Sequence, residues 1–133
     1  MDAAQAIADL TEISPQIREV AIVGADGSLV GSNAPESAAA RLAAAAAKLI
    51  EEAERLRPNV AQLEAATVNG SVFVVRDGTR LIAATTTPEP TVGLVFYDLK
   101  TCLRSVDEPP ARKRRAPASK AKEEKEEADS AAS

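Results

Sequence analysis

Three Asx-Gly dipeptides constrain the fold of this 133-residue chain more than any other feature, because each stands between two largely apolar runs. They are Asp26-Gly27, Asn69-Gly70 and Asp77-Gly78. Such pairs favour tight hairpin turns in which both turn residues take positive φ. The sequence therefore predicts strands at 18–23, 28–31, 62–68, 71–76 and 79–85, paired as one five-stranded antiparallel sheet.

The predicted strand at 71–76 is apolar on both faces, since Val72, Phe73, Val74 and Val75 follow one another. A strand of this kind belongs to a sheet that is covered on both sides. Amphipathic helices for this purpose are predicted at 1–14, at 33–58 and at 91–106. The order α-β-β-α-β-β-β-α predicts an α+β fold in which helices sandwich the sheet.

The long helix has marked ends. Asn33 is expected to cap its N-terminus, with Glu36 at capping-box spacing and Pro35 in the first turn. Pro58 is expected to end it, because a proline pushes the preceding residue out of the helical region.

Two faces of this helix are apolar. The core-facing stripe is predicted to be Leu42, Ala46, Leu49, Ile50, Ala53 and Leu56. The opposite side carries Ala40, Ala43, Ala44 and Ala47, small residues that would let a second helix approach closely. Alanine is also the best helix former, so helix propensity alone explains this second face equally well.

The residues offer little for catalysis or metal binding. The chain has no histidine and a single cysteine, Cys102, so a zinc site of the usual types and an intramolecular disulfide are both excluded. Cys102 falls in an apolar helical pattern and is predicted to be a buried residue rather than a nucleophile. The sequence therefore predicts a protein that is not an enzyme and needs no cofactor or metal. With no secretory signal or membrane-spanning run, a cytoplasmic location is expected.

Charge divides the chain in two. Residues 1–108 hold nine Lys and Arg against fifteen Asp and Glu, a net charge of −6, which argues against nucleic-acid binding by this domain. Residues 109–133 hold seven against five, a net charge of +2, with three prolines and no large apolar side chain. We predict a disordered tail there, because it lacks the apolar area that would offset its ordering entropy. Its basic run at 112–115 (RKRR) suits an acidic surface, although a solubilising role is the simpler interpretation.

Taken together, the element order and four segments resemble the roadblock/dynein light chain family. The segments are AIVGADGSLVGS, ARLAAAAAKLIEEAERL, VNGSVFVVRDGTRLIAATT and TVGLVFYDLKTCL. The resemblance covers about residues 3–107. It implies a profilin-like roadblock fold and a binding module rather than an enzyme.

The resemblance further implies a homodimer that regulates a small Ras-like GTPase. Long helices pack antiparallel and the strands that follow them pair across the two-fold axis, so the expected dimer interface is Ala40, Ala43, Ala44, Ala47, Gln62, Glu64 and Ala66. A charge at Ala44 is then expected to give monomers. The residues expected to contact the GTPase are Arg41, Lys48, Glu52 and Arg55. The alternatives are a scaffold or localisation subunit without GTPase-directed activity, and a small-ligand sensor of the kind that profilin-like and PAS-like sheets form.

Overall fold

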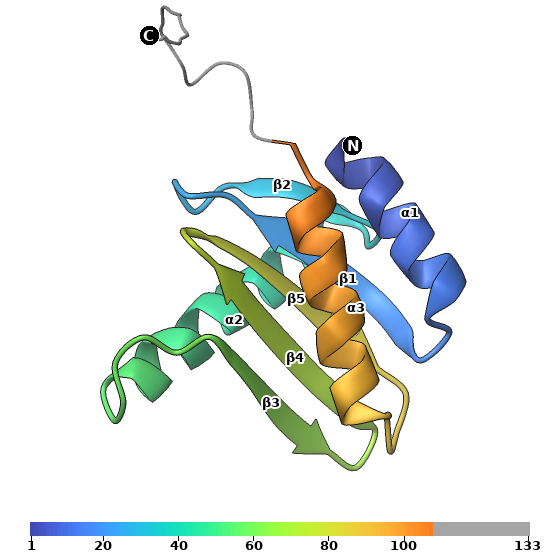
Figure 1. Ribbon diagram of the computed structural model, residues 1–133. Coiled ribbons are helices and arrows are strands. Elements are labelled where there is room, and N and C mark those ends of the chain that lie inside the picture. Colours follow the sequence, from blue (N-terminus) through green and yellow to red (C-terminus); the bar gives the residue numbers. More distant parts are fainter. Residues whose placement is uncertain (108–133) are drawn as a thin grey trace, which may run out of the picture.

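The computed structural model describes residues 1–107 and contains one antiparallel five-stranded sheet with helices on both faces (Figure 1). The elements are α1 (Ala3–Ile13), β1 (Ile17–Val23), β2 (Leu29–Ser32), α2 (Glu36–Glu54), β3 (Gln62–Thr67), β4 (Gly70–Asp77), β5 (Arg80–Thr86) and α3 (Val92–Ser105). The predicted order is confirmed. The predicted tail at 109–133 lies outside the described residues.

The strands lie in the order β2-β1-β5-β4-β3, so β1 and β5 pair in the middle of the sheet and β3 forms one edge. Alternate residues of β4 enter different cores, as the two-faced pattern predicts. Phe73 and Val75 pack under α1 and α3, where the Phe73 ring meets Phe96 edge-on at 4.9 Å between centroids. Val74 packs on the other face with Leu42, Ala46 and Ile50 of α2. Among the elements of residues 1–107, α2 alone covers this face of the sheet.

The hairpin turns differ from the prediction in detail. At each Asx-Gly pair only the glycine takes positive φ, at 84° for Gly27, 139° for Gly70 and 66° for Gly78. Thr67 pairs with Gly70 and Asp77 pairs with Arg80, so the two-residue loops are 68–69 and 78–79. The expectation of positive φ at both residues of each pair was wrong. The dipeptides located the turns, but strand pairing decided which residues form the loops.

The start of α2 is a second correction. Asn33 does not cap the helix, because its side chain bridges backbone groups of β1 instead: Oδ1 accepts from Val20 N–H at 2.8 Å and Nδ2 donates to the Arg18 carbonyl at 2.8 Å. Pro35 occupies the N-cap position and the helix has no side-chain cap. Glu36 lies in the first turn, where its negative charge interacts favourably with the positive end of the helix dipole.

The end of α2 is a third correction. The helix stops at Glu54, and the chain passes through a tightened turn in which the Ala53 carbonyl accepts from the N–H groups of Leu56 and Arg57. Leu56, which was predicted to face the core, is therefore 82 % exposed. The exposed Leu56 lies next to the edge strand β3.

Candidate interaction surface

The edge strand β3 offers an unpaired backbone. It pairs with β4 from Gln62 to Thr67, and none of the described strands lies on its other side. The opposite edge, β2, is only four residues long and packs against α1, where a side chain at Gly31 would meet Ala3 at 2.8 Å. An open, six-residue edge is a template for pairing with another strand.

Between α2 and β3 lies an apolar depression of about 590 Å³, which we name the strand-side groove. It is lined by Leu49, Glu52, Ala53, Arg55, Leu56, Leu63, Glu64 and Ala65. Leu63 and Leu49 are partly buried against the core of the α2 face, whereas Leu56 stands free of it. Sequence patterning missed this site because it assigned Leu49 and Leu56 to the core. Pro58 did not reveal it, because a proline pushes only the preceding residue out of the helical region, and α2 already ends at Glu54.

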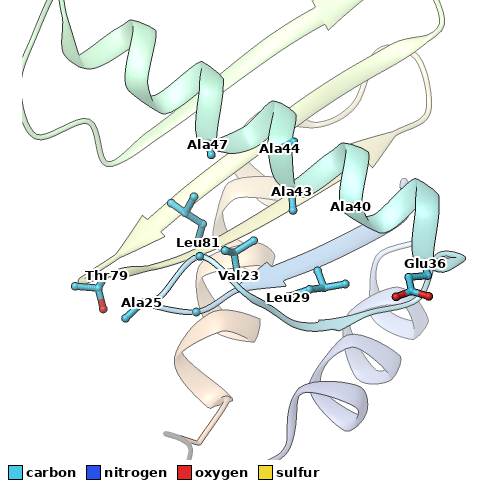
Figure 2. Close-up of a pocket in the computed structure, with 12 residues that line it drawn as sticks. Val23, Ala25, Leu29, Glu36, Ala40, Ala43, Ala44, Ala47, Thr79 and Leu81 are labelled. Carbon is cyan, nitrogen blue, oxygen red and sulfur yellow. The ribbon is translucent and has the colours of Figure 1, made fainter. Parts of the chain in front are cut away.

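A second depression, of about 550 Å³, lies on the other flank of α2, against the β1–β2 hairpin and the start of β5. We name it the hairpin-side groove; its residues are Val23, Gly24, Ala25, Gly27, Leu29, Glu36, Ala40, Ala43, Ala44, Ala47, Thr79 and Leu81. Figure 2 shows the alanines of α2 facing the side chains of Val23 and Leu81 across it. A third depression of about 480 Å³ continues from Ala47 past Glu51 and Glu54. The small alanine side chains are what leave this flank hollow.

The two parts of the predicted dimer interface therefore border different flanks of α2. Ala40, Ala43, Ala44 and Ala47 line the hairpin-side groove. Gln62, Glu64 and Ala66 lie on the edge strand at the opposite flank, where the Glu64 carboxylate accepts from Ser71 Oγ at 2.8 Å. A second copy that paired across the edge of β3 would lie at the strand-side flank and would leave the alanine face, Ala40, Ala43, Ala44 and Ala47, open.

The charged residues predicted to contact a partner lie on the outer face of α2. Lys48 Nζ is 3.2 Å from a Glu52 carboxylate oxygen and 4.0 Å from Glu51, and Arg55 is 3.4 Å from Glu52. Arg41 is exposed on the same helix, about two turns from Lys48 toward the N-terminus. Exposed pairs of this kind contribute about 0–1 kcal/mol, so a partner could exchange them for its own contacts at little cost.

One ion pair ties this surface to the sheet. Arg76 of β4 donates to the Glu54 carboxylate, which also accepts from the Val60 N–H at 3.3 Å. The hydrogen bond from Arg76 is the largest reason that the pKa of Glu54 lies below its usual 4.5, and the N–H groups of Val60 and Asn59 lower it further. The contacts hold the end of α2 and the chain leading into β3 against β4.

This pair gives a testable pH dependence. Because the pKa of Glu54 is lower in the folded state than in the unfolded state, its contribution is complete above pH 4.5 and is lost as the pH falls through the folded pKa. We expect Glu54→Gln to lower the free energy of unfolding at neutral pH and to match the wild type in acid, by urea titration at several pH values. The control Glu51→Gln, which removes an exposed pair spanning 4.0 Å, should change it by less than ~0.5 kcal/mol. A Glu54→Gln deficit that stays constant with pH would contradict this assignment.

The described residues contain no group of three or more Cys, Asp or Glu placed to hold a metal ion. Cys102 is buried, and burial together with the negative charge of Asp9 raises the pKa of its thiol to about 11. The thiol is thus protonated at neutral pH, a poor state for a nucleophile. Over residues 1–107, no helix has the length and hydropathy needed to cross a bilayer.

Comparison with known proteins agrees with this geometry. A scan against models of protein families finds no match, and a search of curated proteins finds no relative. Among solved structures, a Roadblock/LC7 domain from Streptomyces avermitilis aligns with a TM-score of 0.69 at 17 % identity, over 79 % of this chain and 94 % of that one. Myxococcus xanthus MglB aligns with a TM-score of 0.60 at 18 % identity, over 77 % and 89 % of the two chains.

A profilin structure shares the same arrangement of elements. LokiProfilin1, solved in complex with rabbit actin, aligns with a TM-score of 0.55 at 15 % identity, over 77 % of this chain and 92 % of that one. Identities this low establish the arrangement of elements and nothing finer. The resemblance that the sequence suggested is thereby confirmed at the level of structure: this chain has the profilin-like fold of Roadblock/LC7 domains.

Proposed function

We propose that this protein is a non-catalytic, homodimeric regulator or adaptor that binds a small Ras-like GTPase through α2. One observation carries the proposal: a domain with the roadblock fold leaves its longest helix exposed along its outer face, with a groove on each flank. A regulator of this kind works by positioning its partner, so it requires no catalytic residue of its own. A cytoplasmic location and the absence of nucleic-acid binding belong to the same proposal.

In the proposed dimer, β3 pairs with β3 of a second copy. Residues Gln62, Glu64 and Ala66 then lie at the two-fold contact, and the two sheets become one. An isologous contact requires a self-complementary surface, and an antiparallel strand edge meets this requirement through its own backbone. The strand-side groove lies next to this edge, so Leu56 and Leu63 of each copy would lose solvent exposure together. Burial of such apolar area is the main driving force for association.

In this arrangement the alanine face of α2 would contact the GTPase. Residues Ala40, Ala43, Ala44 and Ala47 line the flank that lies away from β3. Arg41 and Lys48 are exposed on the same helix and would provide charges for orienting the GTPase, together with Glu52 and Arg55, which lie toward the strand-side groove. The sequence alone assigned these alanines to the dimer, and their position against the β1–β2 hairpin is the reason for moving them to the GTPase contact.

The test is a turnover and binding assay with a small Ras-like GTPase encoded beside this chain. Adding the protein should change the rate of GTP hydrolysis or nucleotide exchange. The double variant Arg41→Glu, Lys48→Glu should weaken binding about tenfold or more, because both charges lie on the exposed face of α2. Isothermal calorimetry measures the affinity and phosphate release measures the rate.

The control is Lys100→Glu, which reverses one positive charge on α3, on the other face of the sheet. It should bind like the wild type. Absence of binding by the unmodified protein to every neighbouring GTPase would reject the proposed partner. An equal loss with Lys100→Glu would show that α2 is not the docking surface.

A further inference from the structure

A smaller groove lies on the other side of the sheet, between the antiparallel helices α1 and α3. Its volume is about 150 Å³, roughly five times the ~30 Å³ share of one water molecule. It is lined by Met1, Ala6, Asp9, Leu10, Ile13, Asp98, Thr101, Cys102 and Ser105. This groove, which we name the α1–α3 groove, takes no part in the function proposed above.

Asp98 is the unusual residue in it. It is 8 % exposed, so little solvent reaches its carboxylate, and none of residues 1–107 pairs with it by a hydrogen bond or ion pair. An opposite charge interacts more strongly at such a site than in open water, because the surroundings are less polar. A second carboxylate, Asp9, is near enough to Cys102 to raise the pKa of its thiol. Both carboxylates line one apolar groove whose other side chains carry no charge.

A groove of this composition fits a basic side chain. The methylene stem of a lysine or arginine packs on apolar surface such as Leu10 and Ile13, while its charged end pairs with a carboxylate. Thr101 and Ser105 add hydroxyl groups along the same wall, although both already donate to carbonyls of α3. Asp98 is therefore the residue with which a cation carried on a chain segment would pair in this groove.

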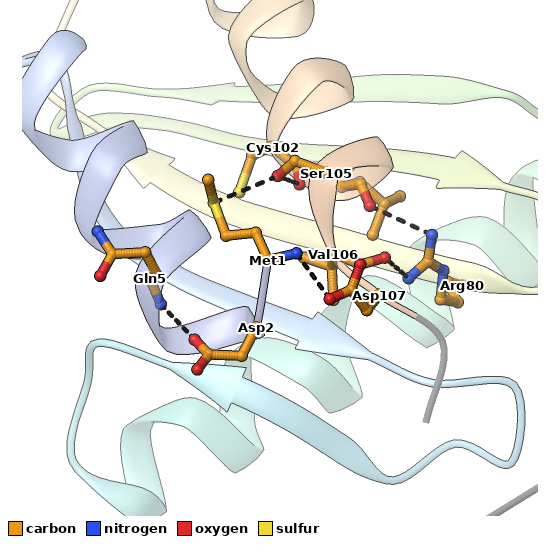
Figure 3. Close-up of polar contacts among 9 residues, drawn as sticks. Met1, Asp2, Gln5, Arg80, Cys102, Ser105, Val106 and Asp107 are labelled. Atoms are coloured by element: carbon orange, nitrogen blue, oxygen red, sulfur yellow. Dashed lines mark hydrogen bonds and ion pairs between the residues drawn. The ribbon is translucent and has the colours of Figure 1, made fainter. Parts of the chain in front are cut away.

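The described part of the chain ends at one mouth of this groove. The Met1 ammonium lies 2.7 Å from the Asp107 carboxylate, and the Asp107 N–H donates to the Met1 carbonyl at 2.9 Å. Figure 3 shows the Met1 side chain lying between this ion pair and the residues Cys102 and Ser105 of α3. The chain that follows Asp107 thus starts beside the groove.

The next basic residues in the sequence are the run 112–115, RKRR. Five residue steps from Asp107 to Arg112 span up to roughly 17 Å when extended. Asp98 lies about 13 Å back along α3 at the ~1.5 Å rise of a helix. An extended segment of this length is long enough to bring the basic run to Asp98. The opposite charges, −6 over residues 1–108 and +2 over the remainder, favour the same contact.

We propose that the basic run 112–115 docks into the α1–α3 groove of its own chain and pairs with Asp98 and Asp9. This self-contact is independent of the dimer and of any GTPase, because it uses the face of the sheet opposite α2. It places the C-terminal segment along α1 and α3 and leaves both flanks of α2 uncovered.

The experiment uses the full chain with a spin label attached at Ser119→Cys, beyond the basic run. Cys102 is buried with a raised pKa, so labelling at neutral pH is directed to the new thiol, and mass spectrometry checks for one label per chain. We expect paramagnetic broadening of the amide signals of groove residues in α1 and α3, and none in α2. Asp98→Asn should remove the broadening, whereas the control Glu12→Gln, the same charge change on α1 outside the groove, should retain it.

A second variant guards against effects of Asp98→Asn on folding. Replacing all four residues 112–115 by serine leaves residues 1–107 unchanged and should also remove the broadening. Broadening that survives either change, or that spreads equally over α2, would overturn the proposal. So would broadening found only when labelled and isotope-enriched chains are mixed, because it would place the segment of another copy in the groove.

Discussion

Gly70→Ala is expected to destabilise the domain by roughly 3 kcal/mol or more. A Cβ at this position would lie 2.0 Å from the carbonyl oxygen of Thr86 and 3.1 Å from its carbonyl carbon, and φ is +139°, a conformation that essentially only glycine adopts. The obstacle is backbone at the ends of β4 and β5, where no side chain can rotate away. Strain in this region costs about 1–3 kcal/mol and overpacking a further 1–3 kcal/mol. Urea titration measures the loss.

Gly78→Ala is the matched control. Gly78 occupies the next hairpin turn with φ of +66°, and a Cβ there would meet nothing within 4 Å. Only the left-handed backbone penalty applies, about 1–2 kcal/mol. Equal losses from the two variants would show that the backbone conformation, and not the contact with Thr86, determines the effect at Gly70.

Leu56→Glu is expected to raise the dimer dissociation constant at least about 100-fold, or ~2.8 kcal/mol. Leu56 is 82 % exposed in the single chain, so folding should change by less than ~0.5 kcal/mol. In the proposed dimer the same position is buried beside β3, and burying a carboxylate without a partner costs several kcal/mol. Sedimentation equilibrium over a range of concentrations measures the dissociation constant directly.

Ala44→Glu distinguishes the two flanks of α2. It introduces the same charge into the hairpin-side groove, so we expect the dimer to persist and GTPase binding to weaken. The sequence alone predicted monomers for this variant. Monomeric Ala44→Glu together with dimeric Leu56→Glu would return the dimer contact to the alanine face and reject pairing through β3.

The helices and strands were predictable because their sequence signals are local. Turn dipeptides, β-branched runs and helical spacing depend on neighbours in the chain, and they gave every element and its order. The two apolar faces of 72–75 also predicted helices on both sides of the sheet, which Phe73 and Val74 confirm by entering different cores. The capping role assigned to Asn33 failed because backbone groups of β1, distant in sequence, compete for the same side chain.

The tertiary structure alone decided where the elements lie relative to one another. Helical periodicity separates an inner from an outer face, but it does not say which strand lies beside each flank. The order β2-β1-β5-β4-β3 sets that, and it places the alanine face beside the hairpin and Leu56 beside the open edge. The burial of Asp98 between α1 and α3 was invisible for the same reason, because solvent exclusion is a property of packing that residues distant in sequence produce together. The sequence by itself thus determined what the elements are, and packing determined which surfaces remain for partners.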